Sequence, residues 1–216
     1  MAKEKQLNYN KTRKVFKNSL KDNAPSKDFQ IDSIIAQVAE NNLTYDGRAN
    51  YYQATGKNAT LTVDAEVDNA NIWLENSATD NFVGNIKILD ASTFENSATL
   101  AGGANSEKIF ASQGDSSLWG GSGGNDTLSG GSGYDEFFYS FGGGKDVINN
   151  ATENDVVNIF NTDLSQITKI ETTTSQIKIS FSDNGSLSIN SAENVGFKYQ
   201  GSTYQLDRHN KTWSAK

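Results

Sequence analysis

Two adjacent glycine-rich units constrain this chain more than any other stretch. Residues 120–129 read GGSGGNDTLS and residues 130–138 read GGSGYDEFF. Both follow the pattern G-G-x-G-x-D-x-U-x, where U is a large apolar residue, and the first unit contains one inserted residue, Gly124. Glycines allow tight turns with backbone angles that a Cβ would forbid. The pattern therefore predicts short strands that alternate with turns, each strand pointing one apolar side chain into a core.

The apolar position of these units recurs over a longer part of the chain. The spacing is nine residues in most steps, with one step of ten and one of eleven. The residues at this position are Leu100, Ile109, Leu118, Leu128, Phe137, Ile148 and Val157. Such a period is typical of repeat architectures, in which two strands form one coil of about eighteen residues. We therefore predict a stack of coils, continued upstream by short strands in residues 51–92.

The sixth position of each unit carries the chemistry. In a coil of two units, this position lies beside the sixth position two units later, which pairs Asp126 with Asp146 and Asp135 with Asp155. Upstream, the position is occupied by Ala98, Glu107 and Ser116. Calcium takes six to eight oxygen ligands in flexible geometry, and carboxylates with turn carbonyls supply such a set. We expect the upstream coils to stack without strong metal binding.

Residues 102–157 resemble the hemolysin-type calcium-binding repeats of bacterial repeats-in-toxin proteins. Besides the two units above, residues 141–149 match well, whereas residues 150–158 keep Asp155 and Val157 but contain no glycine. The resemblance implies an all-β, right-handed parallel β-roll, or β-solenoid, with Ca²⁺ between adjacent turns. It assigns the metal ligands to Asp126, Asp135, Asp146 and Asp155 and to turn glycines Gly120, Gly121, Gly123, Gly130, Gly131, Gly133, Gly142 and Gly144.

The resemblance also implies a function. Proteins of this family are usually exported by a type I secretion apparatus and fold outside the cell. We expect a secreted or cell-surface module that folds on binding calcium and is not an enzyme. Two alternatives remain: an adhesin or matrix protein whose roll is a spacer for a cell-surface or glycan ligand, and the non-catalytic tail of an exported hydrolase or toxin. Turns of this kind can also stack without metal.

Charge and composition exclude several classes of site. The net charge is −7, but residues 1–30 carry +5, so the remainder carries −12. Clustered carboxylates repel one another, so we predict that the acidic part of the chain after residue 30 is loose at low calcium and compact at high calcium. The basic run at residues 11–14 lacks an aromatic platform, so we predict no nucleic-acid partner. The chain has no cysteine, which excludes disulfides and thiolate metal sites.

Catalytic motifs are weak in this sequence. Gly120-x-Ser122-x-Gly124 fits a nucleophile elbow, but it lies in a repeat turn and the only histidine is His209. The same single histidine excludes a zinc protease motif of the H-E-x-x-H kind. No apolar run approaches the ~18 residues that a membrane span needs. Residues 1–10 lack the apolar region of a cleaved signal peptide, which the type I route also predicts.

The sequence divides into four parts. Residues 1–25 are predicted to be a basic flexible tail, and residues 26–45 a helical cap, because Ile31, Ile34, Ile35 and Val38 follow one helical face. Residues 46–158 form the predicted roll, with its calcium-binding repeats at about 102–158. Residues 159–216 are predicted to be an antiparallel β cap that includes the secretion signal region. Its hairpin joins residues 176–181 to 186–189 through Asp183-Asn184-Gly185.

Overall fold

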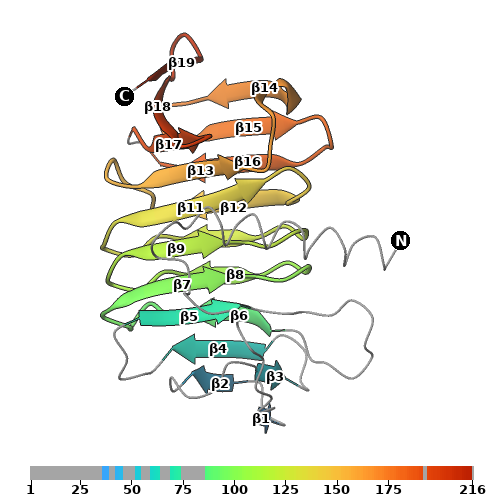
Figure 1. Cartoon of the computed structure of the whole chain (residues 1–216), viewed down its shortest axis with the longest axis vertical. Helices are drawn as coiled ribbons and strands as arrows, with labels where there is room; N and C mark the ends of the chain where they lie inside the picture. Colours follow the sequence, from blue (N-terminus) through green and yellow to red (C-terminus); the bar gives the residue numbers. More distant parts are fainter. Residues whose placement is uncertain are drawn as a thin grey trace.

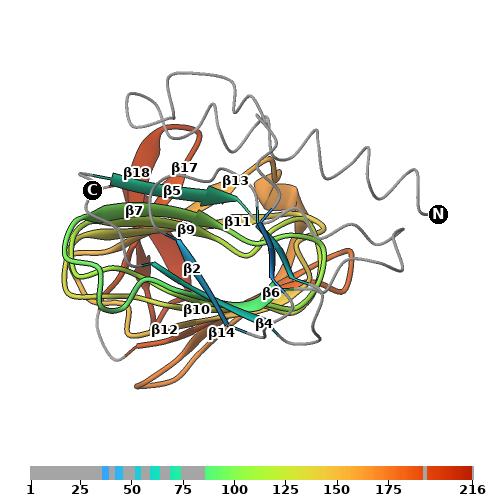
Figure 2. The same ribbon diagram turned by 90° about the horizontal axis from the view of Figure 1, so that it is seen from below.

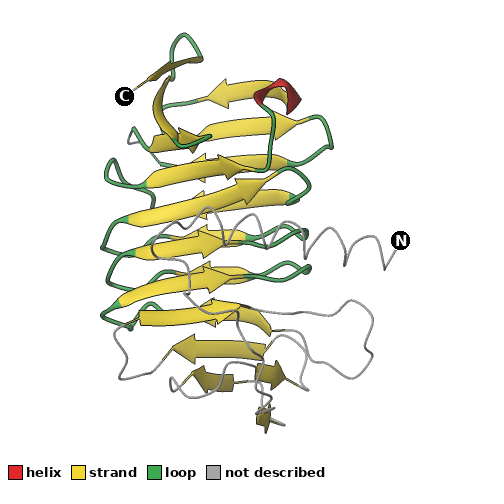
Figure 3. Ribbon diagram, viewed as in Figure 1, coloured by secondary structure: helices red, strands yellow, loops and turns green. Residues whose placement is uncertain are grey.

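The computed structural model describes residues 36–38, 42–45, 52–54, 59–63, 69–73, 86–191 and 194–215. Within these ranges the fold is all-β, with nineteen strands and one 3₁₀ turn, η2 (Leu164–Gln166) (Figure 3). The predicted all-β class is thus confirmed for the described part of the chain. No helix in these ranges is long and apolar enough to cross a membrane. The predicted basic tail, residues 1–25, lies outside the described residues.

Two large sheets contain nearly all of the strands. Sheet one consists, in spatial order, of β14 (Ile167–Thr172), β15 (Ile177–Phe181), β16 (Ser186–Asn190), β12 (Lys145–Asn149), β10 (Thr127–Ser129), β8 (Lys108–Phe110), β6 (Ile86–Asp90), β4 (Ala59–Val63) and β2 (Asn42–Tyr45). Sheet two consists of β19 (Thr212–Ala215), β18 (Ser202–Asp207), β17 (Gly196–Tyr199), β13 (Val156–Phe160), β11 (Asp135–Ser140), β9 (Ser116–Trp119), β7 (Ser97–Ala101) and β5 (Asn69–Trp73). A separate parallel pair joins β1 (Ala36–Val38) to β3 (Tyr52–Ala54).

The chain alternates between the two sheets from β4 to β13 (Figures 1 and 2). Neighbouring strands within each sheet run parallel in this region, so every two strands complete one coil and add one strand to each sheet. Leu128 lies opposite Ile109 in the preceding coil and Ile148 in the following coil, so these two coils take 19 and 20 residues. From β6 to β13, where the connections are described, turns join the strands at both sides of the stack.

The core fills the space between the two sheets. All seven residues of the predicted apolar period belong to it, and they alternate between sheets as the nine-residue spacing requires. Leu100, Leu118, Phe137 and Val157 stack on sheet two, and their rows continue to Ile72 and Phe197. Burial of such side chains stabilises a structure by about 1.5–3 kcal/mol each, which explains why the period persists.

The C-terminal region continues the stack before it departs from it. The predicted hairpin is present as β15 and β16, which pair antiparallel, with Ile177 opposite Ile189. However, β16 also pairs parallel with β12, and β17 with β13, so the parallel stack extends past residue 158. Along the chain, β14 and β15 come between β13 and β16, and they extend sheet one beyond β16. β17–β19 form an antiparallel meander in sheet two.

The predicted helical cap is not seen. Residues 36–38, which the prediction placed in the helix, form strand β1, and residues 42–45 form β2. The rest of the predicted cap, residues 26–35 and 39–41, lies outside the described residues. Val38 pairs with Ala54 in β3, so hydrogen bonds to a neighbouring strand take the place of local helical ones. Apolar spacing alone does not report such pairing, because it is set by tertiary contacts.

Candidate metal centre

The residues at the sixth position form two rows of buried polar side chains. Row one lies at the start of the strands of sheet one and comprises Glu107, Asp126 and Asp146. Row two lies at the start of the strands of sheet two and comprises Ser116, Asp135 and Asp155. All six residues are between 0 and 4% exposed. Because consecutive strands are joined by short turns and belong to opposite sheets, the two rows lie on opposite sides of the stack.

Hydrogen bonds connect successive members of each row. The amide of Glu107 donates to Oδ1 of Asp126 at 2.8 Å, and the amide of Asp126 donates to Oδ1 of Asp146 at 3.0 Å. In row two, the amide of Asp135 donates to Oδ1 of Asp155 at 2.8 Å. The structure therefore brings together both predicted pairs, Asp126 with Asp146 and Asp135 with Asp155.

In several of these carboxylates, the second oxygen accepts a hydrogen bond from an amide in the turn that precedes the residue. Gly131 donates its amide to Oδ2 of Asp135 at 2.7 Å, and Gly103 donates to Oε2 of Glu107 at 3.1 Å. Oδ2 of Asp155 accepts bonds from both the amide and the hydroxyl of Thr152. These bonds satisfy turn amides that glycine-rich loops would otherwise leave to water.

One oxygen in row one is left without a partner. Oδ2 of Asp126 is buried and makes no hydrogen bond. Gly121 corresponds to the donor Gly131 of the next unit, but the inserted Gly124 places it one residue further from the aspartate. The amide of Ser122 donates instead to the carbonyl of Gly103 at 3.1 Å. The longer turn therefore deprives Asp126 of the bond that Asp135 has.

Row two also leaves one oxygen unpartnered, for a different reason. Oδ1 of Asp135 is buried without a group in hydrogen-bond geometry. Its neighbour in the preceding coil is Ser116, whose amide donates to the carbonyl of Tyr134 at 3.0 Å. The Ser116 hydroxyl lies 2.9 Å from the hydroxyl of Ser112. Both rows thus present a desolvated carboxylate oxygen, which is costly unless a proton or a cation satisfies it.

The electrostatic cost is visible in the pKa values of row one. Burial raises the pKa of Asp126 well above its ordinary value, and the charges of Asp146 and Glu107 raise it further. The hydrogen bond from the Glu107 amide and the charge of Lys87 act in the opposite direction. Burial also raises the pKa of Asp146, which the hydrogen bond from Asp126 partly offsets. Desolvation disfavours the ionised form, so without a cation these carboxyl groups hold their protons to higher pH than exposed aspartates do.

Row two is perturbed in the same direction. Burial raises the pKa of Asp135 to about 7, with a smaller upward contribution from the charge of Asp155. The amide of Gly131 lowers this pKa, as do the nearby hydroxyl and amide of Ser116. This row carries two carboxylates where row one carries three, so less negative charge accumulates along it.

The predicted glycine ligands explain how closely the turns stack. A Cβ on Gly121 or Gly131 would collide with a carbonyl oxygen of the preceding coil, and a Cβ on Gly120 with Oδ2 of Asp126. At Gly123, by contrast, the nearest atom would lie 3.7 Å away. Of the other predicted ligands, Gly130 and Gly133 lie in the turn before β11, and Gly142 and Gly144 lie in the turn between β11 and β12. Close stacking accounts for most of these glycines, and a ligand role for their carbonyl oxygens stays a prediction.

The donor chemistry of both rows fits a hard cation. Every candidate atom is an oxygen, and two of these oxygens are buried without a partner. In the described ranges, no three or more Asp, Glu or His side chains are grouped so as to hold a metal ion. A cation in either row would therefore take two carboxylates and complete its shell with backbone carbonyls, which suits Ca²⁺ better than a metal that prefers nitrogen or sulfur.

Both rows end at the C-terminal coil. Asp146 lies opposite Leu187, and the amide of Gly196 bonds to the carbonyl of Asp155, which places Val195 next along row two. Leu187 and Val195 are buried apolar residues of the core. The hairpin contributes a different carboxylate, Asp183, whose oxygens accept the amides of Gly142 and Gly185 at 2.7 and 2.8 Å. Asp183 thereby closes the last glycine turn.

Sequence reasoning missed some members of the site. Glu107 was identified at the sixth position of a coil expected to stack without strong metal binding, and that expectation stays a prediction; the structure buries its carboxylate in row one, next to Asp126. Thr152 was not identified, although it supplies two bonds to Asp155. The sequence signal for Glu107 was its sixth position in the repeat, because glutamate carries the same carboxylate as aspartate on a side chain one methylene longer.

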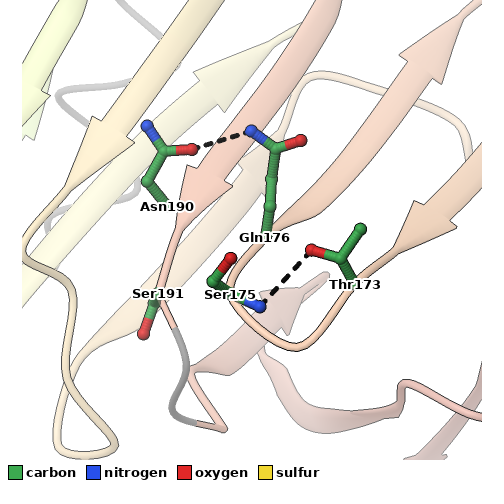
Figure 4. A pocket seen from close by; sticks show the side chains of 5 residues that line it. All are labelled: Thr173, Ser175, Gln176, Asn190 and Ser191. Carbon is green, nitrogen blue, oxygen red and sulfur yellow. Dashed lines mark hydrogen bonds between the residues drawn. The ribbon is translucent and has the colours of Figure 1, made fainter.

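A polar pocket lies apart from both rows. Thr173, Ser175, Gln176, Asn190 and Ser191 line it, at the far ends of β15 and β16 (Figure 4). Gln176 donates to the side chain of Asn190 at 2.8 Å. The lining contains no carboxylate or imidazole, so the pocket lacks the groups of a metal or acid–base site.

The single histidine, His209, is exposed in the turn after β18.

Searches of family models, curated proteins and solved structures find no match to this chain.

Proposed function

We propose that this chain is a calcium-binding module of the parallel β-roll kind, a non-enzymatic part of a bacterial protein that acts outside the cell or on its surface. The resemblance of residues 102–157 to calcium-binding repeats motivates the proposal. Its structural support comes from the buried, unpartnered oxygens of Asp126 and Asp135. The resemblance also implies export by a type I apparatus and a right-handed roll.

The unpartnered oxygens support a cation site because each one adjoins a second carboxylate. Asp126 stacks on Asp146, and Asp135 stacks on Asp155. Adjacent strands are about 4.8 Å apart, so two ionised carboxylates repel by roughly 3 kcal/mol at an effective dielectric constant near 20. A bound Ca²⁺ supplies two positive charges and accepts oxygen donors from both members of a pair.

Calcium binding is thereby coupled to folding. The residues of each pair come from successive coils, so a pair exists only where two coils have stacked. Ligand that binds only the stacked state stabilises that state. Extracellular calcium modules typically bind at about 10⁻⁴–10⁻³ M. A module with this affinity stays loose at cytosolic calcium and becomes compact outside.

A calcium titration followed by far-UV circular dichroism and thermal unfolding tests the proposal. Calcium is expected to raise the β signal and Tm, and magnesium at equal ionic strength is not. Asp126→Asn and Asp135→Asn should each reduce the calcium-dependent rise in Tm, whereas Glu95→Gln removes one charge from an exposed side chain and should not. A Tm that responds equally to both metals, or to calcium equally in all variants, would contradict the proposal.

A further inference from the structure

Three polar side chains meet on the outer face of sheet two. Glu136, Asn158 and Lys198 come from the neighbouring strands β11, β13 and β17. Each of them adjoins a core residue in the sequence. Because successive side chains of a strand point to opposite faces, all three point away from the core. We call Glu136, Asn158 and Lys198 the outer polar triad.

Strand pairing brings the three side chains together. Lys198 lies directly opposite Asn158 in the parallel pairing of β17 with β13. Nζ of Lys198 lies 3.1 Å from Oε1 of Glu136, and Nδ2 of Asn158 donates to the same oxygen at 2.9 Å. The lysine side chain starts on β17 and reaches a carboxylate on β11, so it crosses β13 beside the side chain of Asn158.

The surroundings shield the triad in part from water. The side chains of Lys198 and Glu136 are 30% and 15% exposed. Phe138, which lies opposite Asn158 on β11, is 1% exposed. The hydroxyl of Tyr134 lies 3.4 Å from Nζ of Lys198, and the centre of its ring 6.0 Å away. Partial exclusion of water strengthens the attraction between the ammonium and carboxylate groups.

The lysine is held as an ammonium group next to its proton acceptor. Burial lowers the pKa of Lys198, but the charge of Glu136 and the hydrogen bond to it outweigh this effect, so that the pKa is raised. A lysine amine becomes a nucleophile when it loses a proton to an adjacent base. Glu136 is such a base, because its carboxylate already accepts a hydrogen bond from Nζ.

Asn158 presents the matching electrophile. The carbonyl carbon of its side chain, Cγ, is one bond from Nδ2, which donates to the oxygen that Lys198 also contacts. The amide nitrogen therefore faces the carboxyl group that can give it a proton as it leaves. Holding nucleophile, electrophile and acid–base group together in one chain removes most of the entropic cost of their encounter.

We propose that Lys198 and Asn158 form an intramolecular isopeptide bond, with Glu136 as the catalytic acid–base. Nζ loses a proton to Glu136 and attacks Cγ of Asn158. The bond from Cγ to Nδ2 then breaks. Two of the three ammonium protons of Lys198 pass through Glu136 to the leaving nitrogen, which departs as ammonium. The products are a neutral amide and one ammonium ion, and Glu136 is again a carboxylate.

The bond would fasten the end of the stack. β13 is the last strand of the alternating coils, and β17 begins the C-terminal meander, so the bond joins these two parts directly. The chain has no cysteine and therefore no disulfide to do so. A covalent link of this kind limits the unfolded chain as a disulfide does, without dependence on redox conditions. This inference is independent of calcium binding.

The intact mass of the folded, full-length chain tests the proposal. The bond is expected to lower the mass by about 17 Da from the value that the sequence gives, because one ammonia is lost. Trypsin does not cleave after an acylated lysine, so a digest should contain one branched peptide in which residues 146–169 are joined to residues 179–208. The unmodified mass with only linear peptides would overturn the proposal.

Four variants assign the roles of the residues. Asn158→Asp should lose about 18 Da instead, because water leaves in place of ammonia. Lys198→Arg keeps the charge but should abolish the loss, which distinguishes the bond from a succinimide formed by asparagine alone. Glu136→Gln should slow bond formation by about a hundred-fold, as loss of a general base does. The control, Lys169→Arg, alters the 2.7 Å ion pair of Lys169 with Glu171 and should leave the loss unchanged. A loss that persists in Lys198→Arg would overturn the assignment.

Discussion

Rows one and two are built from the same repeat, yet they differ in charge. Row one contains three buried carboxylates, Glu107, Asp126 and Asp146. Row two contains only two, Asp135 and Asp155, and has Ser116 at its third position. The charge of Lys87 acts on row one, where it lowers the pKa of Asp126. A single change at the sixth position, from serine to glutamate, therefore sets how much negative charge a row must hold.

The turns differ as well. The turn before Asp135 supplies an amide to its carboxylate, whereas the turn before Asp126 is one residue longer and supplies none. Row one thus combines more charge with fewer donors, and its carboxyl groups are perturbed more strongly. Regular spacing therefore builds both rows, while their electrostatics depend on single residues within the turns.

The largest predicted effect is on the pH dependence of stability without calcium. The folded-state pKa of Asp135 is raised to about 7 from an ordinary value near 4, so the folded state binds this proton more tightly than the unfolded state does. The resulting stability is complete below pH 4 and is lost as the pH rises through 7. It amounts to about 4 kcal/mol for a pKa raised from near 4 to about 7.

Row one should contribute more of this pH dependence than row two. In chelator, Tm is expected to fall between pH 4 and pH 8, and Asp126→Asn should reduce the fall more than Asp135→Asn does. Glu95→Gln serves as the control for loss of one exposed charge. Thermal unfolding at a series of pH values measures the effect. Equal reduction by all three substitutions would remove the distinction between the rows.

The next effect concerns turn stacking. Gly131→Ala, in the turn before Asp135, places a Cβ against the carbonyl oxygen of Ser112, so the coils must separate. We expect a loss of about 2–3 kcal/mol, as for overpacked sites. Gly123→Ala, in the turn before Asp126, is the matched control, because its Cβ would lie 3.7 Å from the nearest atom. Denaturant unfolding compares the two, and equal losses would refute close stacking as the reason for Gly131.

A smaller effect should follow from making row two resemble row one. Ser116→Asp adds a third carboxylate beside Asp135, which should lower Tm in chelator and enlarge the calcium-dependent rise. We expect a change of about 1–2 kcal/mol in each condition. Ser117→Asp places the same charge on the outer face of the same strand and should leave the calcium response unchanged. Calorimetry in chelator and in calcium would reveal whether the two variants differ.

The smallest effect is expected at Lys87. Lys87→Gln removes the cation that lowers the pKa of Asp126, so that pKa should rise further. The side chain is partly exposed, and solvent screening limits the loss of stability at neutral pH to under about 1 kcal/mol. Lys108→Gln, on an exposed side chain of β8, is the comparison. A greater loss at Lys108 would show that row one does not sense Lys87.

Much of the stack could be predicted because its signals are local and repeated. The nine-residue period identified Leu118 and Phe137 as core residues of successive coils, and the sixth position paired Asp135 with Asp155. The hairpin was predicted from alternation and an Asn-Gly turn. The helical cap was predicted wrongly at residues 36–38, because spacing of apolar residues does not reveal a strand partner sixteen residues away.

The sequence alone determined the period, the alternation between two layers and the alignment of the acidic positions. These features depend on spacing, and a single chain displays its own spacing. Only the tertiary structure decided that Glu107 joins row one, that Leu187 and Val195 end the rows, and that Asp126 lacks a donor. It also decided that Trp119 is buried on the outer face of its sheet. Each of these outcomes depends on which atoms of distant segments meet, and contacts of that kind leave no fixed interval in the sequence.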